Sequence, residues 1–172
     1  ANAVREQADC IMLSGETTTG KYPLECVRVM HRIIDATEGL NPNERNHLIT
    51  LREPKSKLVR SATVLAQELD RGGILLFTRS GQTAKIAAAL RPNGIPIYAF
   101  TDKEETFRQM LILWGIEPFL IPFSDDLEGT IHQAFHLLRE KNWCQPGSRL
   151  AVITTSQAGE DTIDVLQLRT LV

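Results

Sequence analysis

The 172-residue sequence is poor in cysteine and contains no apolar run long enough to cross a membrane. Its three cysteines, Cys10, Cys26 and Cys144, are odd in number and follow neither disulfide nor metal-ligand spacing. They give no basis for a disulfide-stapled secreted protein or for a zinc site, and we expect reduced thiols in the cytoplasm. No secretory leader is visible, so we expect no membrane association. Because the cysteines do not have metal-ligand spacing, we also expect no metal bound by this chain.

An excess of positive charge is also lacking. Lysine and arginine total 19 against 21 aspartates and glutamates, which gives a net charge of −2 and an isoelectric point near 6.1. A chain with this balance has no electrostatic preference for nucleic acid or for an anionic membrane surface. Its 42% hydrophobic content is that of an ordinary globular protein, of one domain or one domain plus a further piece.

The first forty residues contain one strand-to-helix pattern. The apolar run Cys10–Leu13 predicts a short buried strand, and Ser14-Gly15 ends it. Pro23 then occupies the first turn of a helix that continues to about residue 36. A strand, a polar loop and a helix make one βα unit, which is a fragment of a barrel or of a doubly wound sheet. Its strand lacks neighbours, so we expect this stretch to be disordered, to pack abnormally or to pair with another chain.

Residues 38–55 separate this unit from a more regular region. They are rich in Gly, Asn, Pro and charged residues, which predicts a linker with one helical turn around residues 45–49. The predicted division is therefore 1–37 for the βα unit, 38–55 for the linker and 56–172 for a second domain.

Residues 56–172 alternate between helical and strand patterns. Helices are predicted from the cap Ser56, over 83–90, over 104–114 and over 127–143; strands are predicted at 74–77, 95–100, 116–123, 150–154 and 163–171. Such alternation predicts a three-layer α/β/α domain with a mostly parallel sheet of about five strands. The last strand should be antiparallel, because residues 155–162 are too few for a crossover helix.

One loop of this domain has the chemistry of an anion site. Thr78-Arg79-Ser80-Gly81-Gln82-Thr83 lies between a buried strand and the start of a helix. A helix N-terminus offers free backbone N–H groups and a partial positive charge, and Arg79 adds a cation that can bind phosphate in a bidentate manner. On these residues alone, a phosphate site and a turn whose hydroxyls only cap the helix are equally good interpretations.

The N-terminal motif resembles a known family. Met12-Leu13-Ser14-Gly15-Glu16-Thr17, followed by Gly20, Tyr22, Pro23 and Glu25, is similar to the last strand, loop and helix of the catalytic TIM barrel of pyruvate kinase. Ala1–Val4 fits the family's preceding helix. Residues 56–172 resemble the C-terminal regulatory domain of that family in element order and length, so the resemblance covers essentially the whole chain.

The resemblance implies a parent enzyme of glycolysis that transfers a phosphoryl group from phosphoenolpyruvate to ADP with Mg²⁺ and K⁺. In the family the lysine, the metal-binding carboxylates and a threonine come from earlier barrel strands. Ser14, Gly15 and Glu16 correspond to the rim of that active site, and we expect Glu16 to order its own loop and not to bind metal. The 172-residue chain alone is therefore predicted to be inactive, with the missing barrel as its partner and a homo-oligomer as its assembly.

For the second domain the resemblance implies an allosteric site. The family's equivalent loop holds a phosphate of the activator, and this role is carried over to Thr78, Arg79, Ser80, Gly81 and Thr83, with Gln82 as an amide donor. In members activated by fructose 1,6-bisphosphate, the loop between the last two strands brings a tryptophan and an arginine to the second phosphate. Here that loop, residues 155–161, has neither residue and carries Glu160 and Asp161. Because carboxylates repel phosphate, we expect a sugar monophosphate or AMP in place of the bisphosphate.

Two other functions stay open at this point. The chain could be an oligomerisation module with no ligand, in which an edge strand such as 163–171 pairs with a second subunit. It could also be a stand-alone enzyme for a small phosphorylated molecule, with Asp102 as its acid or base. His132 and His136 have a zinc-compatible spacing but no third ligand, so we expect solvated histidines. Cys144 is interpreted as a packing residue.

Overall fold

The computed structural model describes residues 1–40, 50–158 and 161–171, and its contacts divide the chain into two compact units, Ala1–His47 and Leu48–Val172. Half of the expected linker, residues 41–49, which include the predicted helical turn at 45–49, lies outside the described residues. So do Glu160 and the side chain of Asp161. The two units are described separately below.

The first unit contains helices α1 (Asn2–Arg5), α2 (Gly15–Thr18) and α3 (Pro23–Leu40). The prediction of a strand at Cys10–Leu13 is wrong, because these residues have no partner strand and make no ladder. The exposure of their side chains still alternates, since Met12 is 82% exposed while Ile11 and Leu13 are half-buried. An extended segment without a neighbouring strand cannot satisfy the hydrogen-bonding pattern of a sheet.

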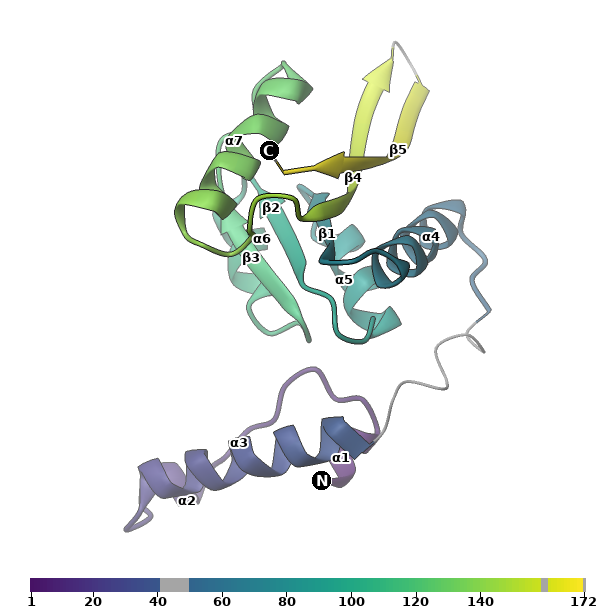
Figure 1. Ribbon diagram of the computed structural model, residues 1–172. Helices are drawn as coiled ribbons and strands as arrows, with labels where there is room; N and C mark the ends of the chain where they lie inside the picture. The colour runs from purple at the N-terminus through teal and green to yellow at the C-terminus, as the bar shows by residue number, and fades with distance from the viewer. Residues whose placement is uncertain (41–49, 159–160, 172) are drawn as a thin grey trace. The chain divides into compact units, whose positions relative to one another are not determined.

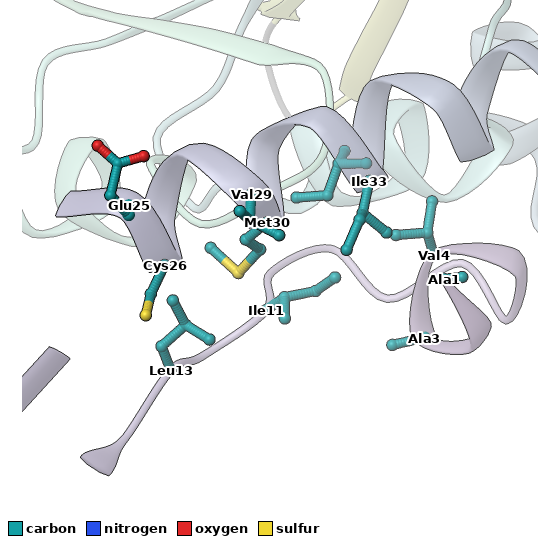
Figure 2. A pocket seen from close by; sticks show the side chains of 11 residues that line it. Ala1, Ala3, Val4, Ile11, Leu13, Glu25, Cys26, Val29, Met30 and Ile33 are labelled. Carbon is teal, nitrogen blue, oxygen red and sulfur yellow. The ribbon is translucent and has the colours of Figure 1, made fainter. Parts of the chain in front are cut away.

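Ile11 and Leu13 line one wall of an apolar cavity of about 430 Å³, and α3 forms the opposite wall. Figure 2 shows both side chains directed toward the helix face that carries Met30 and Ile33. The other side of α3 exposes large apolar side chains, of which Leu24 is 71% exposed. This unit therefore leaves much apolar surface uncovered for its size.

The second unit contains four helices and five strands among its described residues (Figure 1). The helices are α4 (Pro54–Glu68), α5 (Gln82–Leu90), α6 (Glu104–Met110) and α7 (Leu127–Glu140). The strands are β1 (Gly72–Phe77), β2 (Ile97–Thr101), β3 (Ile116–Leu120), β4 (Arg149–Ala158) and β5 (Asp161–Thr170). Their order in the sheet is β3-β2-β1-β4-β5, and the first four are parallel while β5 runs antiparallel to β4. The predicted α/β class and mixed sheet are confirmed.

Two hydrophobic cores lie on opposite faces of this sheet. One joins the alanine-rich sides of α4 and α5 and Met110 of α6 to residues such as Ile74 and Leu76. The other joins α7 to an aromatic cluster that contains Phe77, Phe100 and Phe119. Alternate residues of each buried strand point to opposite faces, so continuous apolar runs are needed to fill both cores. The unit is thus a three-layer α/β/α structure.

Several boundaries differ from the predictions. Helix α3 continues to Leu40, into the residues predicted as linker, and α6, α7 and β3 end earlier than predicted. Helix α4 begins at Pro54 with Glu53 as its N-cap, so Ser56 lies inside the first turn and is not the cap. Proline is favoured at this position because its missing N–H would be unpaired there in any case. The last two strands also pair as far as Ala158 with Asp161, so most of the predicted loop 155–161 belongs to a hairpin. None of the described helices has the length and hydropathy to span a membrane.

Candidate functional site

The Thr78–Thr83 loop lies at the carboxyl ends of the parallel strands. It follows β1, whose neighbours are β2 on one side and β4 on the other. The chain leaves β1 toward β2 and later returns to β4, so the strand order reverses here, and ligands of open α/β sheets bind at such a switch point. The N–H of Thr78 donates to the carbonyl of Phe100 at 2.9 Å, which ties the start of the loop to β2.

The loop turns sharply at Gly81, which has a φ of 76° and precedes the first residue of α5. Glycine adopts this left-handed conformation without the steric cost that a Cβ brings. The Gly81 N–H donates to Thr78 Oγ1 at 3.0 Å, and the Gln82 N–H donates more weakly to Ser80 Oγ at 3.4 Å. Thr78 therefore shapes the loop in this conformation.

The six predicted residues fall into two groups by exposure. Thr78, Gly81 and Thr83 are buried, whereas Arg79, Ser80 and Gln82 face solvent. The exposed guanidinium, hydroxyl and amide all donate hydrogen bonds, and they gather at the beginning of α5, where the helix dipole is positive. The geometry suits an anion that contacts these three side chains.

The starts of the other two helices at this edge of the sheet differ in charge. Helix α5 has no acidic residue in its first turn. Helix α6 begins with Glu104 and Glu105, and α7 begins with Glu128 after an N-cap, Asp126, that accepts the N–H groups of residues 128 and 129 at 3.1 Å each. Carboxylates at a helix start occupy the place that an external anion would take. Among the three helices that follow β1, β2 and β3, α5 is the one whose first turn carries no carboxylate.

Arg79 is held by three neighbours. Its Nε donates to Asp102 Oδ2 at 2.9 Å, its guanidinium lies 5.4 Å from the ring centre of Phe123, and its carbonyl accepts the Thr106 hydroxyl at 2.7 Å. The side chain is nevertheless 65% exposed. Because Asp102 binds through Nε, the two terminal nitrogens can still donate to a planar pair of phosphate oxygens.

The carboxylate of Asp102 is not free, as it would be in a general acid or base that waits for a substrate. One carboxylate oxygen is engaged by Arg79, and the other, Oδ1, is buried and accepts no hydrogen bond within the described part of the chain. The sequence could identify Asp102 as the carboxylate nearest to the loop along the fold. It could not reveal the ion pair, because the two residues are on loops after different strands.

Helix α5 has two further cations, Lys85 in its first turn and Arg91 at its C-cap. Arg91 ends α5 at the opposite tip of that helix, where it is buried and lies 4.7 Å from the ring centre of Trp114. Lys85 is exposed one turn into α5 and remains near the loop.

Arg169 of β5 donates to Glu128 of α7 at 2.9 Å, and this hydrogen bond lowers the pKa of the Glu128 carboxyl.

Ser14, Gly15 and Glu16 lie in the first unit at the start of α2. Glu16 Oε2 accepts the Ser14 N–H at 3.0 Å, and hydrogen bonds from its own N–H and from that of Ser14 lower the pKa of Glu16. This carboxylate orders its own loop. Across the described ranges no three His, Cys, Asp or Glu side chains come together as a metal site. His132 and His136 are both exposed.

Comparisons with known proteins agree with this architecture. The family model "Pyruvate kinase, alpha/beta domain" matches residues 56–168. A pyruvate kinase of Mycobacterium intracellulare is 34% identical over 92% of this chain and 34% of its own length, and plastidial pyruvate kinase 3 of Arabidopsis thaliana is 31% identical over 98% and 30%. The crystal structure of a pyruvate kinase from Cryptosporidium parvum superposes with a TM-score of 0.85 at 25% identity, over 99% of this chain and 34% of that one.

The chain spans about a third of the length of these relatives. The matched family model, however, covers nearly the whole second unit, which contains the Thr78–Thr83 loop. The chain therefore belongs to the pyruvate kinase family and carries its C-terminal α/β domain.

Proposed function

We propose that this chain is the regulatory part of a pyruvate kinase and that its Thr78–Thr83 loop binds the phosphate of a small effector. The observation that carries the proposal is the open N-terminus of α5. It combines a left-handed glycine, an exposed arginine and the absence of acidic residues in the first turn, at the switch point of the sheet. Binding there would be coupled reciprocally to substrate affinity in the longer enzyme.

The charges around the loop favour an effector with one phosphate. Helix α7, on the other face of the sheet, begins with Asp126 and with Glu128, which is paired with Arg169, and the connection from β4 to β5 carries Glu160 and Asp161 in its sequence. A second phosphate directed toward either element would meet like charge and would lose hydration as well. A sugar monophosphate or AMP is therefore proposed in preference to fructose 1,6-bisphosphate.

Phosphoryl transfer from phosphoenolpyruvate to ADP, with Mg²⁺ and K⁺, is proposed for the longer enzyme. The first unit supplies the rim residues Ser14–Glu16, and its apolar surface around Ile11, Leu13 and α3 would pack against the rest of the barrel. We expect the 172-residue chain alone to show no turnover. A coupled assay with both substrates checks this, and turnover above the rate without protein would refute it.

A homo-oligomer is part of the proposal. Strand β5 is at the edge of the sheet, and its apolar residues Ile163 and Leu168 are 44% and 50% exposed. An open edge with exposed apolar side chains is suited to pairing with a second copy.

The oligomerisation module without a ligand remains the main alternative, whereas the ion pair of Asp102 weakens the case for a stand-alone enzyme. A cytoplasmic location also belongs to the proposal, although relatives include chloroplastic isozymes.

A thermal-shift screen of phosphorylated metabolites tests the proposed site. Ligands that bind the folded state raise the melting temperature with concentration. Glucose 6-phosphate or AMP should raise it in the native chain, and the rise should be smaller in a Ser80→Ala variant because one exposed donor is lost. The absence of any phosphate-dependent rise would favour the oligomerisation module.

Neutralising Asp102 should strengthen phosphate binding. In Asp102→Asn the carbonyl oxygen can still accept the Arg79 Nε–H, but the negative charge beside the guanidinium is gone. A like charge near the surface contributes roughly 1 kcal/mol, so we expect binding about three- to ten-fold tighter by calorimetry. Asp70→Asn, at an exposed carboxylate that precedes β1 at the opposite edge, should leave the affinity unchanged. Weaker binding in Asp102→Asn would show that the carboxylate is needed for the site.

A further inference from the structure

A second cavity lies at the amino ends of the strands, at the opposite edge of the sheet from the Thr78–Thr83 loop. Its volume is about 310 Å³, within the lower range of small-ligand pockets. It opens where the chain after α7 returns to β4, and the residues that line it include Arg71, Tyr98, Trp143, Cys144, Gln145 and Ser148. These residues come from the starts of β1, β2 and β4 and from the loop between α7 and β4.

Trp143 gives this cavity a rigid aromatic wall. Its ring lies edge-on to Tyr98 at 6.3 Å and to Phe119 at 6.0 Å, and its backbone carbonyl accepts the Tyr98 hydroxyl at 2.8 Å. Burial and a hydrogen bond with Cys144 raise the pKa of Tyr98, which keeps this phenol a neutral donor. Although it is fixed in this way, Trp143 remains 45% exposed. An indole that packs against two other rings but is half uncovered is suited to stacking with a ligand ring.

Arg71 gives the cavity a cationic end. It makes no ion pair with any described residue, and its backbone has a φ of 52°, which a non-glycine residue rarely adopts. Its carbonyl accepts the Arg149 N–H at 3.3 Å, so the position of its backbone is fixed beside the start of β4. Strained backbone of this kind is concentrated at ligand-binding positions.

The remaining polar lining adds donors without adding negative charge. Gln145 contributes an amide and Ser148 a hydroxyl, and the lining contains no aspartate or glutamate. The carboxylate that acts on Tyr98 is Glu117 on β3, which is not part of the lining. A cation would find no counter-charge here, and a neutral ligand would leave Arg71 unused.

We propose that this cavity binds a small aromatic carboxylate, with its ring against Trp143 and its carboxylate on Arg71. The site is separate from the phosphate loop, because the two lie at opposite ends of β1. The proposal is therefore independent of the effector site, and either one can hold without the other. A planar carboxylate matches the guanidinium fork, and a single ring fits a cavity of this size.

Titration with benzoate, followed by two-dimensional ¹H–¹⁵N NMR of the 172-residue chain, tests the proposal. The chain has two tryptophans, and only Trp143 lines the cavity. Its indole N–H resonance should shift in a saturable manner, while that of Trp114 stays in place. Benzyl alcohol, which has the ring without the charge, should bind at least about ten-fold more weakly because it lacks the charge-assisted hydrogen bonds.

Two arginine variants locate the contact. Arg71→Gln should weaken benzoate binding by about ten-fold, since an exposed charge-assisted contact is lost. Arg79→Gln, at the opposite edge, should not change benzoate binding, and inorganic phosphate should not shift the Trp143 resonance. The proposal is overturned if benzoate leaves Trp143 unmoved, if benzyl alcohol binds as well as benzoate, or if Arg71→Gln binds benzoate with native affinity.

Discussion

Replacement of Arg79 with glutamine should weaken the binding of a phosphate monoester by about 10- to 100-fold, because a hydrogen bond to a charged group contributes roughly 1.5–3 kcal/mol. Arg79 is the exposed cation of the loop, and its terminal nitrogens are open while Nε is held by Asp102. Glutamine is preferred to alanine because its amide can still donate to Asp102. Calorimetric titration with glucose 6-phosphate measures the loss.

The variant should keep the stability of the native chain. An exposed ion pair contributes only about 0–1 kcal/mol, and a donor remains for the carboxylate. Arg149→Gln is a matched control, because Arg149 is exposed at the start of β4 on the opposite edge of the sheet. It should bind phosphate as the native chain does. Equal losses in both variants would mean that general charge, and not the loop, attracts the ligand.

Replacement of Phe100 with alanine should lower the free energy of unfolding of the second unit by about 3–5 kcal/mol. Phe100 is fully buried in β2, stacked on Phe119 at 4.9 Å between ring centres and 5.5 Å from Phe77. Truncation removes the buried ring and leaves a cavity between neighbours that cannot close it. Both tryptophans of the chain lie in the second unit, so their fluorescence in a urea titration reports this unit alone.

Ile112→Ala is the control for this substitution. Ile112 is 61% exposed, so its truncation should change the unfolding free energy by no more than about 0.5 kcal/mol. A loss below about 1 kcal/mol in Phe100→Ala would contradict the description of the aromatic cluster as the core beneath α7.

The sheet of the second unit could be predicted because its strands are buried on both faces. Runs such as Ile74–Phe77 are continuously apolar and are bounded by turn formers, so pattern alone locates them. The antiparallel pairing of the last two strands could be predicted because the connection between them is too short for a crossover helix. The full length of β4 and β5 could not be predicted, because their outer parts from Thr155 onward pair through the backbone and carry polar side chains.

The first unit shows where an apolar pattern is insufficient. Cys10–Leu13 has the composition of a buried strand, but a strand needs a hydrogen-bonding neighbour, and the described residues provide none there. Two of these residues, Ile11 and Leu13, instead line a cavity against α3. A local pattern indicates which conformation a segment can adopt, and tertiary partners decide whether it forms.

The candidate site was partly visible in the sequence. The loop and its position before α5 followed from the strand-to-helix pattern and from the resemblance, and three of its six residues face solvent. The contacts of Arg79 with Asp102, Thr106 and Phe123 could not be foreseen, because they join loops after three different strands. Burial of Thr78 and Thr83 also depends on packing that no local pattern encodes.

Calorimetric titration of the chain with glucose 6-phosphate, AMP and fructose 1,6-bisphosphate tests the central claim most directly. The proposed site predicts that one of the monophosphates binds with a single site per chain, that the bisphosphate binds no more tightly, and that Arg79→Gln removes most of the affinity. Tighter binding of the bisphosphate would contradict the single-phosphate site. No binding of any of the three, or unchanged binding in Arg79→Gln, would contradict the assignment of the Thr78–Thr83 loop.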